Sequence, residues 1–469
     1  MAKLDSSFPL FEQLMRAHNL PEIVVNNFHY YYNLVLNGER GLISEEEISP
    51  IDSVEGLEQL EGYIDAGKTA MSKAVIIKLN GGLGTSMGLD KAKSLLTARK
   101  DLNFLDISIR QVLALREKYS TYIPLIFMNS YNTDSDTQAV IDTYPHFKGV
   151  VPATMTQYKV PKVLQDTLAP AVWPENTDLE WCPPGHGEVY IALETTGILD
   201  SLLEKGYEYA FISNIDNLGA TLDLGILGYL AQNKIPFMME VVNRTPADKK
   251  GGHLARHKDG HLVLREVAQC PEKDIDSFQD ITKYKYFNSN NLWINLRALK
   301  TYLNDHNNVL GLPLIRNSKT VDPKQKNSPK VFQLETAMGS AISVFPGAQA
   351  VRVTKARFLP IKTCADLLAL RSDIYKMDDE YNVYSDSRRK LGTIKITLDD
   401  EYYKLISDFE SRVQVVPSLL HCQNLDVEGE VCFNKPITVK GYVTLVNTKQ
   451  HSCNLPDSDI FENGTFVCR

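Results

Sequence analysis

The sequence predicts an α/β protein with a largely parallel sheet and helices on both of its faces. Two observations lead to this fold class. Short runs of β-branched and other apolar residues alternate with segments of helical periodicity along much of the chain. The 469 residues, 43% of them apolar and 23% charged, also have the composition and length of an ordinary globular protein of about three domains.

Four apolar runs are the expected strands of this sheet. They cover residues 74–79, 124–128, 207–213 and 236–242. Helices are expected over 105–118, around Val140 and Ile141, and over 196–204. Because sheets of this kind bind ligands at the carboxyl ends of their strands, the residues directly after each strand are the first candidates for a site.

The N-terminal segment, residues 1–45, is expected to be helical. Phe8, Phe11, Leu14 and Met15 recur at helical spacing and would pack the segment on the larger body. That body, residues 46–376, carries the alternating pattern and is the predicted catalytic domain.

The C-terminal region, residues 377–469, has a different texture. Residues 427–433 resemble residues 439–445 at a spacing of 439 − 427 = 12, and a weaker third copy lies near 461–467. Alternating β-branched residues with glycines predict short strands, arranged either as coils of a small β-helix or as a plain β-sandwich. The repeats leave open whether this region caps a monomer or associates with a second copy.

The charge balance and the cysteines exclude several classes of protein. Lys and Arg number 50 and Asp and Glu 58, a net charge of −8, which disfavours a nucleic-acid partner but allows a local basic pocket for a small anion. The chain contains no run of about 18 apolar residues, so no membrane-spanning helix is expected. Seven dispersed cysteines without a Cys-x-x-Cys pair indicate reduced thiols and a cytoplasmic location.

The most informative stretch is residues 78–94, KLNGGLGTSMGLDKAKS, in which four glycines follow the first expected strand. Glycines expose backbone N–H groups, and an array of them ahead of a helix binds anions. A dinucleotide fingerprint is excluded because position 87 is Met, and a Walker loop is excluded because no Gly-Lys-Ser/Thr follows. The loop therefore predicts a phosphate or nucleotide site of a third kind rather than only a tight turn.

This loop resembles that of the eukaryotic-type UTP–glucose-1-phosphate uridylyltransferases. Seven further motifs follow in the family's order, together spanning about residues 75–373. They are VPKVLQ (160–165), PPGHG (183–187), SNIDNLG (213–219), KGGHL (250–254), FNSNNLW (287–293), QLETAMG (333–339) and KTCADL (362–367). The resemblance implies a Rossmann-like nucleotidyltransferase core with a mixed, mostly parallel sheet, a helical N-terminal segment and a C-terminal left-handed β-helix.

The implied substrates are UTP and glucose 1-phosphate. A phosphate oxygen of the sugar phosphate would attack the α-phosphorus of UTP, and pyrophosphate would leave. Because the nucleophile is already an anion, catalysis needs alignment and charge neutralisation rather than a general base.

Two lysines and one aspartate are the expected catalytic groups. The resemblance implies that Lys93 faces the β- and γ-phosphates and that Lys362 reaches the phosphates from a distant part of the chain; Lys91 is expected to face solvent. Asp216 follows the third strand and is expected to bind Mg²⁺, since a bare carboxylate would repel the triphosphate. The alternative for Asp216 is an N-cap of the next helix.

The resemblance also implies a uridine side of the site. Gln157 matches the glutamine that reads uracil, and an amide can meet both a donor and an acceptor. Leu79 and Gly81 are expected to contribute backbone groups. The other residues expected on this side are Asn80, Gly82, Met128, Gly185 and His186. Core packing is the alternative for Met128, and a packed or capping role is the alternative for His186.

The sugar side is expected to hold neutral polar groups and a carboxylate. The positions that match the family are Asn214, Gly252, Glu266, Asn288 and Asn290. Asn is unfavourable in a strand, so Asn288 and Asn290 indicate either sugar binding or a turn or bulge. Glu335 matches a family position without an assignable role.

One departure from the family and two alternative functions remain. Residues 89–92 read LDKA where many relatives have Cys-Thr-Gly-Pro, which leaves the local loop conformation open. A broad UDP-sugar or a UDP-N-acetylhexosamine pyrophosphorylase is the nearest alternative, although the FNSNNLW motif favours glucose. A non-catalytic nucleotide-sugar sensor is disfavoured, because it should have lost Lys93, Asp216 and Lys362.

Overall fold

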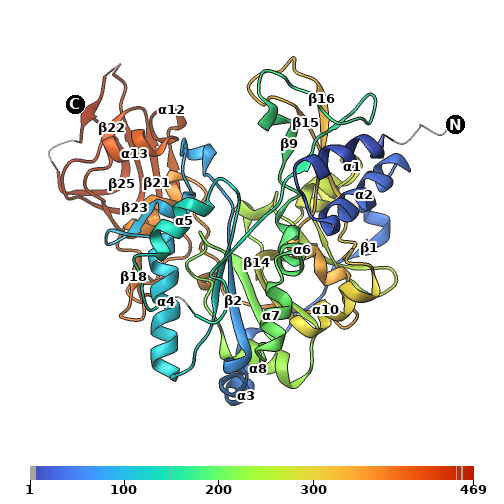
Figure 1. The fold of residues 1–469 in the computed structure, drawn as a ribbon. Helices are drawn as coiled ribbons and strands as arrows, with labels where there is room; N and C mark the ends of the chain where they lie inside the picture. Colours follow the sequence, from blue (N-terminus) through green and yellow to red (C-terminus); the bar gives the residue numbers. More distant parts are fainter. Residues whose placement is uncertain (1–6, 148, 450, 456–457, 469) are drawn as a thin grey trace.

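The computed structural model describes residues 7–147, 149–449, 451–455 and 458–468. A central sheet is covered by helices on both faces, and Figure 1 shows the N-terminal helices (blue) and the C-terminal strands (orange to red) on opposite sides of it. No helix of the described residues is long and apolar enough to cross a membrane.

The central sheet is mixed, which confirms the predicted α/β class. Its main path, in spatial order, is β1 (Ile48–Ser49), β12 (His253–His257), β14 (Tyr286–Asn295), β10 (Tyr209–Asn214), β2 (Ala74–Asn80), β5 (Leu125–Asn129) and β6 (Thr154–Thr156). Off this path lie β11 (Phe237–Asn243), β13 (Leu262–Arg265) and β17 (Gln349–Arg352). The strands β10, β2, β5 and β6 are parallel, and β14 runs antiparallel to β10 and β11. The four strands expected from the sequence are therefore β2, β5, β10 and β11.

Both faces of the central strands are buried. Along β2, Ile76 packs in one core with the helices α4 (Phe104–Tyr119), α8 (Leu224–Gln232) and α11 (Cys364–Arg371). The alternate residues Val75 and Ile77 pack in a second core with α1 (Phe8–Ala17), α2 (Glu22–Leu36), α6 (Val189–Thr195), α7 (Ile198–Glu204) and α10 (Leu296–Asp305). Burial on both faces explains why these strands are continuously apolar.

The N-terminal segment contains the helices α1 and α2, as predicted, whereas residues 37–44 are not helical and residues 1–6 lie outside the described residues. Phe11, Met15 and Tyr32 of α1 and α2 are fully buried in the second core. The expected helix over 105–118 is α4; Asn103 caps it by accepting a hydrogen bond from Asp106 N–H, and the helix ends at Ser120 in the left-handed region. The helix expected around Val140 is α5 (Asp134–Ile141).

The remaining elements are short. Two-stranded and three-stranded sheets pair β3 (Thr97–Arg99) with β4 (Leu102–Asn103), β7 (Val160–Pro161) with β9 (Trp181–Cys182), β18 (Tyr375–Met377) with β19 (Val383–Ser385), and β16 (Lys330–Glu335) with both β15 (Ile315–Thr320) and β8 (Val163–Leu164). The short helices are α3 (Ile64–Ala70), α9 (Ile275–Gln279), α12 (Asp400–Tyr403) and α13 (Ile406–Arg412).

The C-terminal strands pair in parallel, which contradicts a plain antiparallel sandwich. One sheet holds β20 (Lys395–Leu398), β21 (Ser418–Glu428), β23 (Thr438–Val446) and β25 (Ile460–Val467), and a second pairs β22 (Val431–Cys432) with β24 (Cys453–Asn454). Val427 lies opposite Leu445, a register of 445 − 427 = 18 residues. The 12-residue spacing seen in the sequence is therefore not the structural repeat.

Candidate active site

The glycine loop follows β2 and is closed by its own turns. Gly84 and Gly88 have φ angles of +65° and +74°, which favour glycine, and flank the 3₁₀ turn of residues 85–87. Lys93 N–H donates to the carbonyl oxygen of Gly82 at 3.0 Å and starts another short 3₁₀ turn. The next α-helix, α4, begins at Phe104, close to the start expected from the sequence, so the loop leads into short 3₁₀ turns before it.

The loop delivers Lys93 to Asp216. Lys93 Nζ donates to Asp216 Oδ2 at 2.7 Å and to the carbonyl oxygen of Ile361. The two side chains are only 16% and 17% exposed. Asp216 lies just beyond the end of β10, where the strand-end rule placed it. The N-cap alternative for Asp216 was wrong, because Asp223 caps α8.

Lys362 lies beside this pair. Ile361 N–H donates to the carbonyl oxygen of Asp216 at 3.3 Å, so the backbone before Lys362 is fixed to the Asp216 loop. The Lys362 side chain is exposed. The backbone N–H of Lys362 donates to Asp366 Oδ2 at 2.8 Å. Burial raises the pKa of Glu266, and the Lys362 ammonium opposes that rise, which places the two charges near each other. Lys91 is exposed, as predicted.

The expected uridine groups converge at the ends of β2 and β5. Gln157 Nε2 donates to the carbonyl oxygen of Gly185 at 2.9 Å, and Gln157 N–H donates to the carbonyl oxygen of Asn129 at 2.7 Å. A Cβ atom added to Gly81 would lie 3.2 Å from Gln157 Oε1. The structure therefore brings Gly81, Gln157 and Gly185 together, and Gly82 follows Gly81 with open space beside it.

His186 is held in one tautomer. Its Nδ1 accepts a hydrogen bond from Met338 N–H at 2.9 Å, which leaves the proton on Nε2. Burial lowers the pKa of His186 to about 4, so the ring is neutral near pH 7. Gly185 has a φ of +84°, and a Cβ there would lie 2.4 Å from the carbonyl oxygen of Thr336, so only glycine fits this turn.

Two of the expected uridine residues, Asn80 and Leu79, make hydrogen bonds within the protein, and a third, Met128, is buried. The Asn80 side chain is buried and donates to Asn129 Oδ1 at 2.9 Å and Thr137 Oγ1 at 2.7 Å, which locks β2 to β5 and α5. The carbonyl oxygen of Leu79 accepts from Ile215 N–H at 3.0 Å. Met128 is 2% exposed within the second core, and this burial supports the core-packing alternative for its side chain.

The expected sugar-side residues form a second group. A Cβ added to Gly252 would lie 2.6 Å from the Glu266 carboxylate, and Asn288 N–H donates to the carbonyl oxygen of Gly252 at 3.2 Å. Asn288 Nδ2 donates to Asn290 Oδ1 at 2.8 Å, and Asn290 has a φ of +57°. The register of β11 against β14 shifts between Glu240 and Val241, opposite this stretch, so β14 has a bulge here.

Asn214 is the last residue of β10 and is half-buried. Its carbonyl oxygen accepts from Asn217 N–H at 3.2 Å, which begins the turn that carries Asp216. Because Asn214 lies two residues before Asp216, it stands at the same strand end as the contact between Lys93 and Asp216.

Known proteins match this chain over most of its length. A family model described as UTP–glucose-1-phosphate uridylyltransferase matches residues 25–440. The chain belongs to this uridylyltransferase family. A probable UTP–glucose-1-phosphate uridylyltransferase of Schizosaccharomyces pombe is 40% identical over 394 residues, covering 84% of this chain and 77% of the relative. The UTP–glucose-1-phosphate uridylyltransferase of Hordeum vulgare is 38% identical and covers 95% of this chain and 94% of the relative.

Solved structures extend the family match to the whole fold. A variant UDP-glucose pyrophosphorylase from Leishmania major, solved in complex with UDP-glucose, is 43% identical with a TM-score of 0.93, covering 99% of this chain and 100% of that chain. A UDP-glucose phosphorylase from Trypanosoma brucei is 42% identical with a TM-score of 0.89, covering 99% and 100%. The C-terminal region and the N-terminal helices of this uridylyltransferase-family chain thus have structural counterparts as well.

A buried polar network that was not predicted from the sequence lies next to the turn that carries Asp216. The Glu240 carboxylate on β11 accepts hydrogen bonds from Arg357 Nη2 at 2.6 Å and Trp293 Nε1 at 2.9 Å. Asn291 Nδ2 donates to the same carboxylate at 3.0 Å, and Asn217 Nδ2 donates to Asn291 Oδ1 at 3.1 Å. The network therefore supports the turn that carries Asp216. The available signal was a single glutamate inside the apolar run PFMMEVV.

Proposed function

We propose that this chain transfers a uridylyl group from UTP to glucose 1-phosphate, giving UDP-glucose and pyrophosphate reversibly. One observation carries the proposal. In a member of this uridylyltransferase family, Lys93, Asp216 and the backbone before Lys362 meet at the carboxyl ends of β2 and β10, although they are far apart in the sequence. A site of this kind can align and neutralise a polyphosphate.

The lysines supply the positive charge that the reaction needs. Lys93 would contact the leaving pyrophosphate, and the exposed Lys362 would reach the phosphates from the opposite side of the Asp216 loop. An in-line attack on the α-phosphorus requires the two substrates to be held close and aligned. The neutral His186, whose Nδ1 already accepts a hydrogen bond, fits a contact through Nε2–H rather than proton abstraction.

The substrates would divide between the two groups of residues described above. The glycine loop with Gln157, Gly185 and His186 would bind the uridine and its phosphates. Asn214, Gly252, Glu266, Asn288 and Asn290 would bind the glucose phosphate. The contact between the Gln157 amide and the backbone of Gly185 gives the uracil reader a fixed orientation.

Asp216 fits a magnesium site. Mg²⁺ usually takes one or two carboxylates and completes its shell with phosphates and water. Asp216 offers one carboxylate, mostly buried, at the strand end where the triphosphate would lie. When bound, the ion would neutralise phosphate charge; Asp216 would hold it, and Lys93 would exchange its contact with Asp216 for one with the phosphates.

A direct assay tests the proposed reaction and its nearest alternatives. Purified protein with UTP and Mg²⁺ should release pyrophosphate rapidly with glucose 1-phosphate and slowly with galactose 1-phosphate or N-acetylglucosamine 1-phosphate. Preference for either of the other sugars would favour the broader UDP-sugar or the UDP-N-acetylhexosamine pyrophosphorylase. UTP binding without pyrophosphate release would contradict the proposed activity.

Further expectations concern the whole chain. The parallel pairing of the C-terminal strands supports a left-handed β-helix over residues 377–469, following a helical segment (1–45) and a catalytic domain (46–376). A cytoplasmic location is inferred from the seven cysteines, which all lie in the described ranges and are free thiols. Association of two copies through the C-terminal region stays a proposal that light scattering can test.

A further inference from the structure

Lys78 joins the two ends of the loop that carries Asp216. Its Nζ donates to Ser213 Oγ at 2.8 Å and to the carbonyl oxygen of Ala220 at 2.7 Å. Ser213 precedes Asp216 and Ala220 follows it, while Lys78 itself lies on β2 just before the glycine loop. The position of this one ammonium group therefore restrains the strand of the nucleotide loop and the Asp216 loop together.

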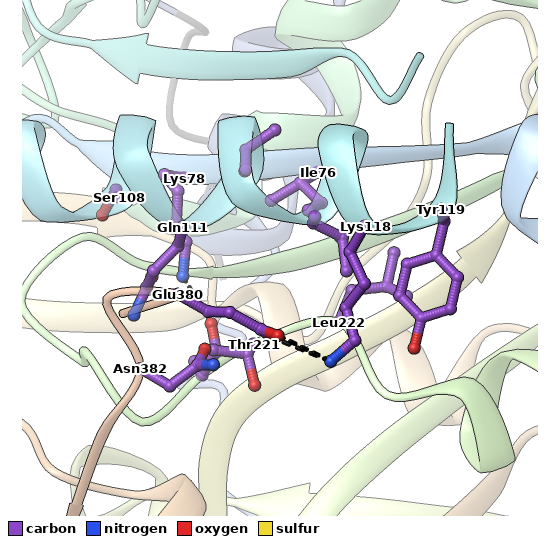
Figure 2. Close-up of a pocket in the computed structure, with 13 residues that line it drawn as sticks. Ile76, Lys78, Ser108, Gln111, Lys118, Tyr119, Thr221, Leu222, Glu380 and Asn382 are labelled. Carbon is purple, nitrogen blue, oxygen red and sulfur yellow. Dashed lines mark hydrogen bonds and ion pairs between the residues drawn. The ribbon is translucent and has the colours of Figure 1, made fainter. Parts of the chain in front are cut away.

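Lys78 also borders a cavity of about 200 Å³ between β2 and α4, shown in Figure 2. None of the residues predicted to bind substrate lines it. Its wall is mixed: the apolar side chains of Ile76, Val112, Leu115 and Leu222 alternate with polar ones such as Gln111, Thr221 and Asn382. At its exposed edge the Lys118 ammonium pairs with the Glu380 carboxylate at 2.8 Å, and the two charges cancel.

The cavity wall includes one basic group that has no carboxylate partner among the described residues. Lys78 is 3% exposed, and no described carboxylate lies within ion-pair distance of it. Burial and the Arg357 guanidinium lower the pKa of Lys78 to about 7, while Glu240 and Asp216 act at longer range in the opposite direction. A buried ammonium normally has an anionic partner, so this wall favours a ligand that supplies one.

Two hydrogen-bond donors at the cavity are incompletely used. Lys78 has three N–H groups when protonated, and two of them have the acceptors described above. Ser108 on α4 is 1% exposed and lines the same cavity, and its Oγ has no hydrogen-bond partner among the described residues. An acceptor group in the cavity would satisfy both donors.

The chemistry of the wall selects the class of ligand. One buried positive charge balances one negative charge, and a dianionic phosphate would leave a second charge buried and unpaired. The cavity volume corresponds to roughly seven water molecules at about 30 Å³ each, which suits a small molecule. The aliphatic side chains Ile76, Val112, Leu115 and Leu222 suit a short hydrocarbon chain behind the anionic group.

We propose that this cavity is a second ligand site, for a short-chain monocarboxylate, and that its occupancy strengthens the hold of Lys78 on the Asp216 loop. The carboxylate would accept the third N–H of Lys78 and the hydroxyl proton of Ser108. A carboxylate beside Lys78 favours the ammonium form, so the bonds to Ser213 and Ala220 become charge-assisted. The effect on the reaction rests on the proposed function, but the binding itself does not.

Binding is tested with butyrate on the full-length protein. Crystals soaked in 4-bromobutyrate should show anomalous bromine density in the cavity, and calorimetry should detect butyrate binding. Leu115→Trp fills the cavity and should weaken binding at least about tenfold, whereas Glu117→Trp places the same ring on the exposed side of α4 and should leave binding unchanged. Ser108→Ala removes one donor without adding bulk and should also weaken binding, which covers the case in which Leu115→Trp fails to fold.

Several results would overturn the proposal. Bromine outside the cavity, equal butyrate affinity in the wild type and both cavity variants, or tighter binding of inorganic phosphate than of butyrate would each contradict it. In the uridylyl-transfer assay, butyrate should lower the Mg²⁺ concentration for half-maximal rate several-fold in the wild type and not in Leu115→Trp. Butyrate binding without this change would contradict the coupling to the Asp216 loop. Absence of any turnover would contradict the proposed function, and the binding experiments alone would then show whether the cavity is a ligand site.

Discussion

At the scale of single residues, the contact between Lys93 and Asp216 is the central feature of the site. The two charges lie 2.7 Å apart and are mostly shielded from water. Their positions are fixed before substrate arrives, by the closed glycine loop on one side and by the turn after β10 on the other. Such preorganisation is what electrostatic catalysis of phosphoryl and nucleotidyl transfer requires.

Lys93→Ala should lower kcat by about 10²–10³-fold, the cost typical of losing one group that stabilises transition-state charge. Lys91→Ala is the matched control, because Lys91 belongs to the same loop but is exposed. Steady-state kinetics should show the loss only for Lys93→Ala, with the melting temperatures of both variants near that of the wild type. Equal kcat in the two variants would remove Lys93 from the mechanism.

Gln157→Ala should weaken UTP binding by about tenfold or more and reduce the preference for UTP over CTP, because the amide is expected to read the uracil edge. Gln165→Ala is a suitable control, since Gln165 donates to Ser318 and Val331 away from the loop. Competition between UTP and CTP measures the preference directly. A variant that keeps the full preference would show that Gln157 does not read the base.

At the scale of elements, the glycine loop fixes Lys93 through close packing. A Cβ added to Gly84 would lie 2.8 Å from Leu89 Cδ1 and 3.2 Å from Lys93 Cβ and Cγ, and the φ of Gly84 is +65°. The residues 89–92 that depart from the family pattern thus fold back on the loop. A glycine at position 84 is required both for the turn and for the position of the lysine.

Gly84→Ala should therefore reduce kcat by about tenfold or more and lower thermal stability. Gly62→Ala is the control, because a Cβ there meets no atom within 4 Å and the residue has no positive φ. Measuring kcat and the melting temperature of both variants separates loop strain from a general effect of the substitution. The idea fails if Gly84→Ala keeps wild-type turnover.

At the scale of the whole molecule, the sequence predicted the fold class and the main strands and helices better than the contacts between residues far apart in the chain. The strand β2 was predictable because burial on both faces makes it a continuous apolar run, and the helix α4 because its buried residues recur at helical spacing. The Lys93–Asp216 contact joins residues 123 positions apart, and Glu240 and Arg357 are 117 apart. No local pattern reports such contacts. The strand-end rule and the family resemblance indicated the first pair, whereas the isolated Glu240 in an apolar run did not identify Arg357 as its partner.

The C-terminal register shows the same limit. The similarity of residues 427–433 and 439–445 reports alternating side chains but not the length of the connection between strands. In the structure Val427 lies opposite Leu445, so the paired strands are offset by 18 residues rather than 12. Register depends on the lengths of the connections between the paired strands, which sequence similarity between two short segments does not encode.

The pH dependence of folding should reflect Glu188, which is buried with Oε1 lacking a hydrogen-bond partner in the described structure. Burial raises the pKa of Glu188 to about 8 from an ordinary value of 4.5. Its favourable contribution is therefore complete below about pH 4.5 and is lost as the pH rises toward 8. Glu188→Gln should raise the melting temperature more at pH 8 than at pH 5.

Glu204→Gln, an exposed substitution on α7, is the control for this measurement. It should change the melting temperature little and equally at both pH values. A Glu188→Gln variant whose melting temperature changes by the same amount at pH 5 and pH 8 would show that Glu188 is not held protonated in the folded protein.

The most direct test is a crystal structure of this protein with UDP-glucose and Mg²⁺. We predict that the diphosphate lies within contact of the Lys93 and Lys362 ammonium groups, with Asp216 on the metal ion, the uracil beside Gln157 and the glucose beside Asn288 and Glu266. A diphosphate bound away from both lysines and from Asp216 would contradict it.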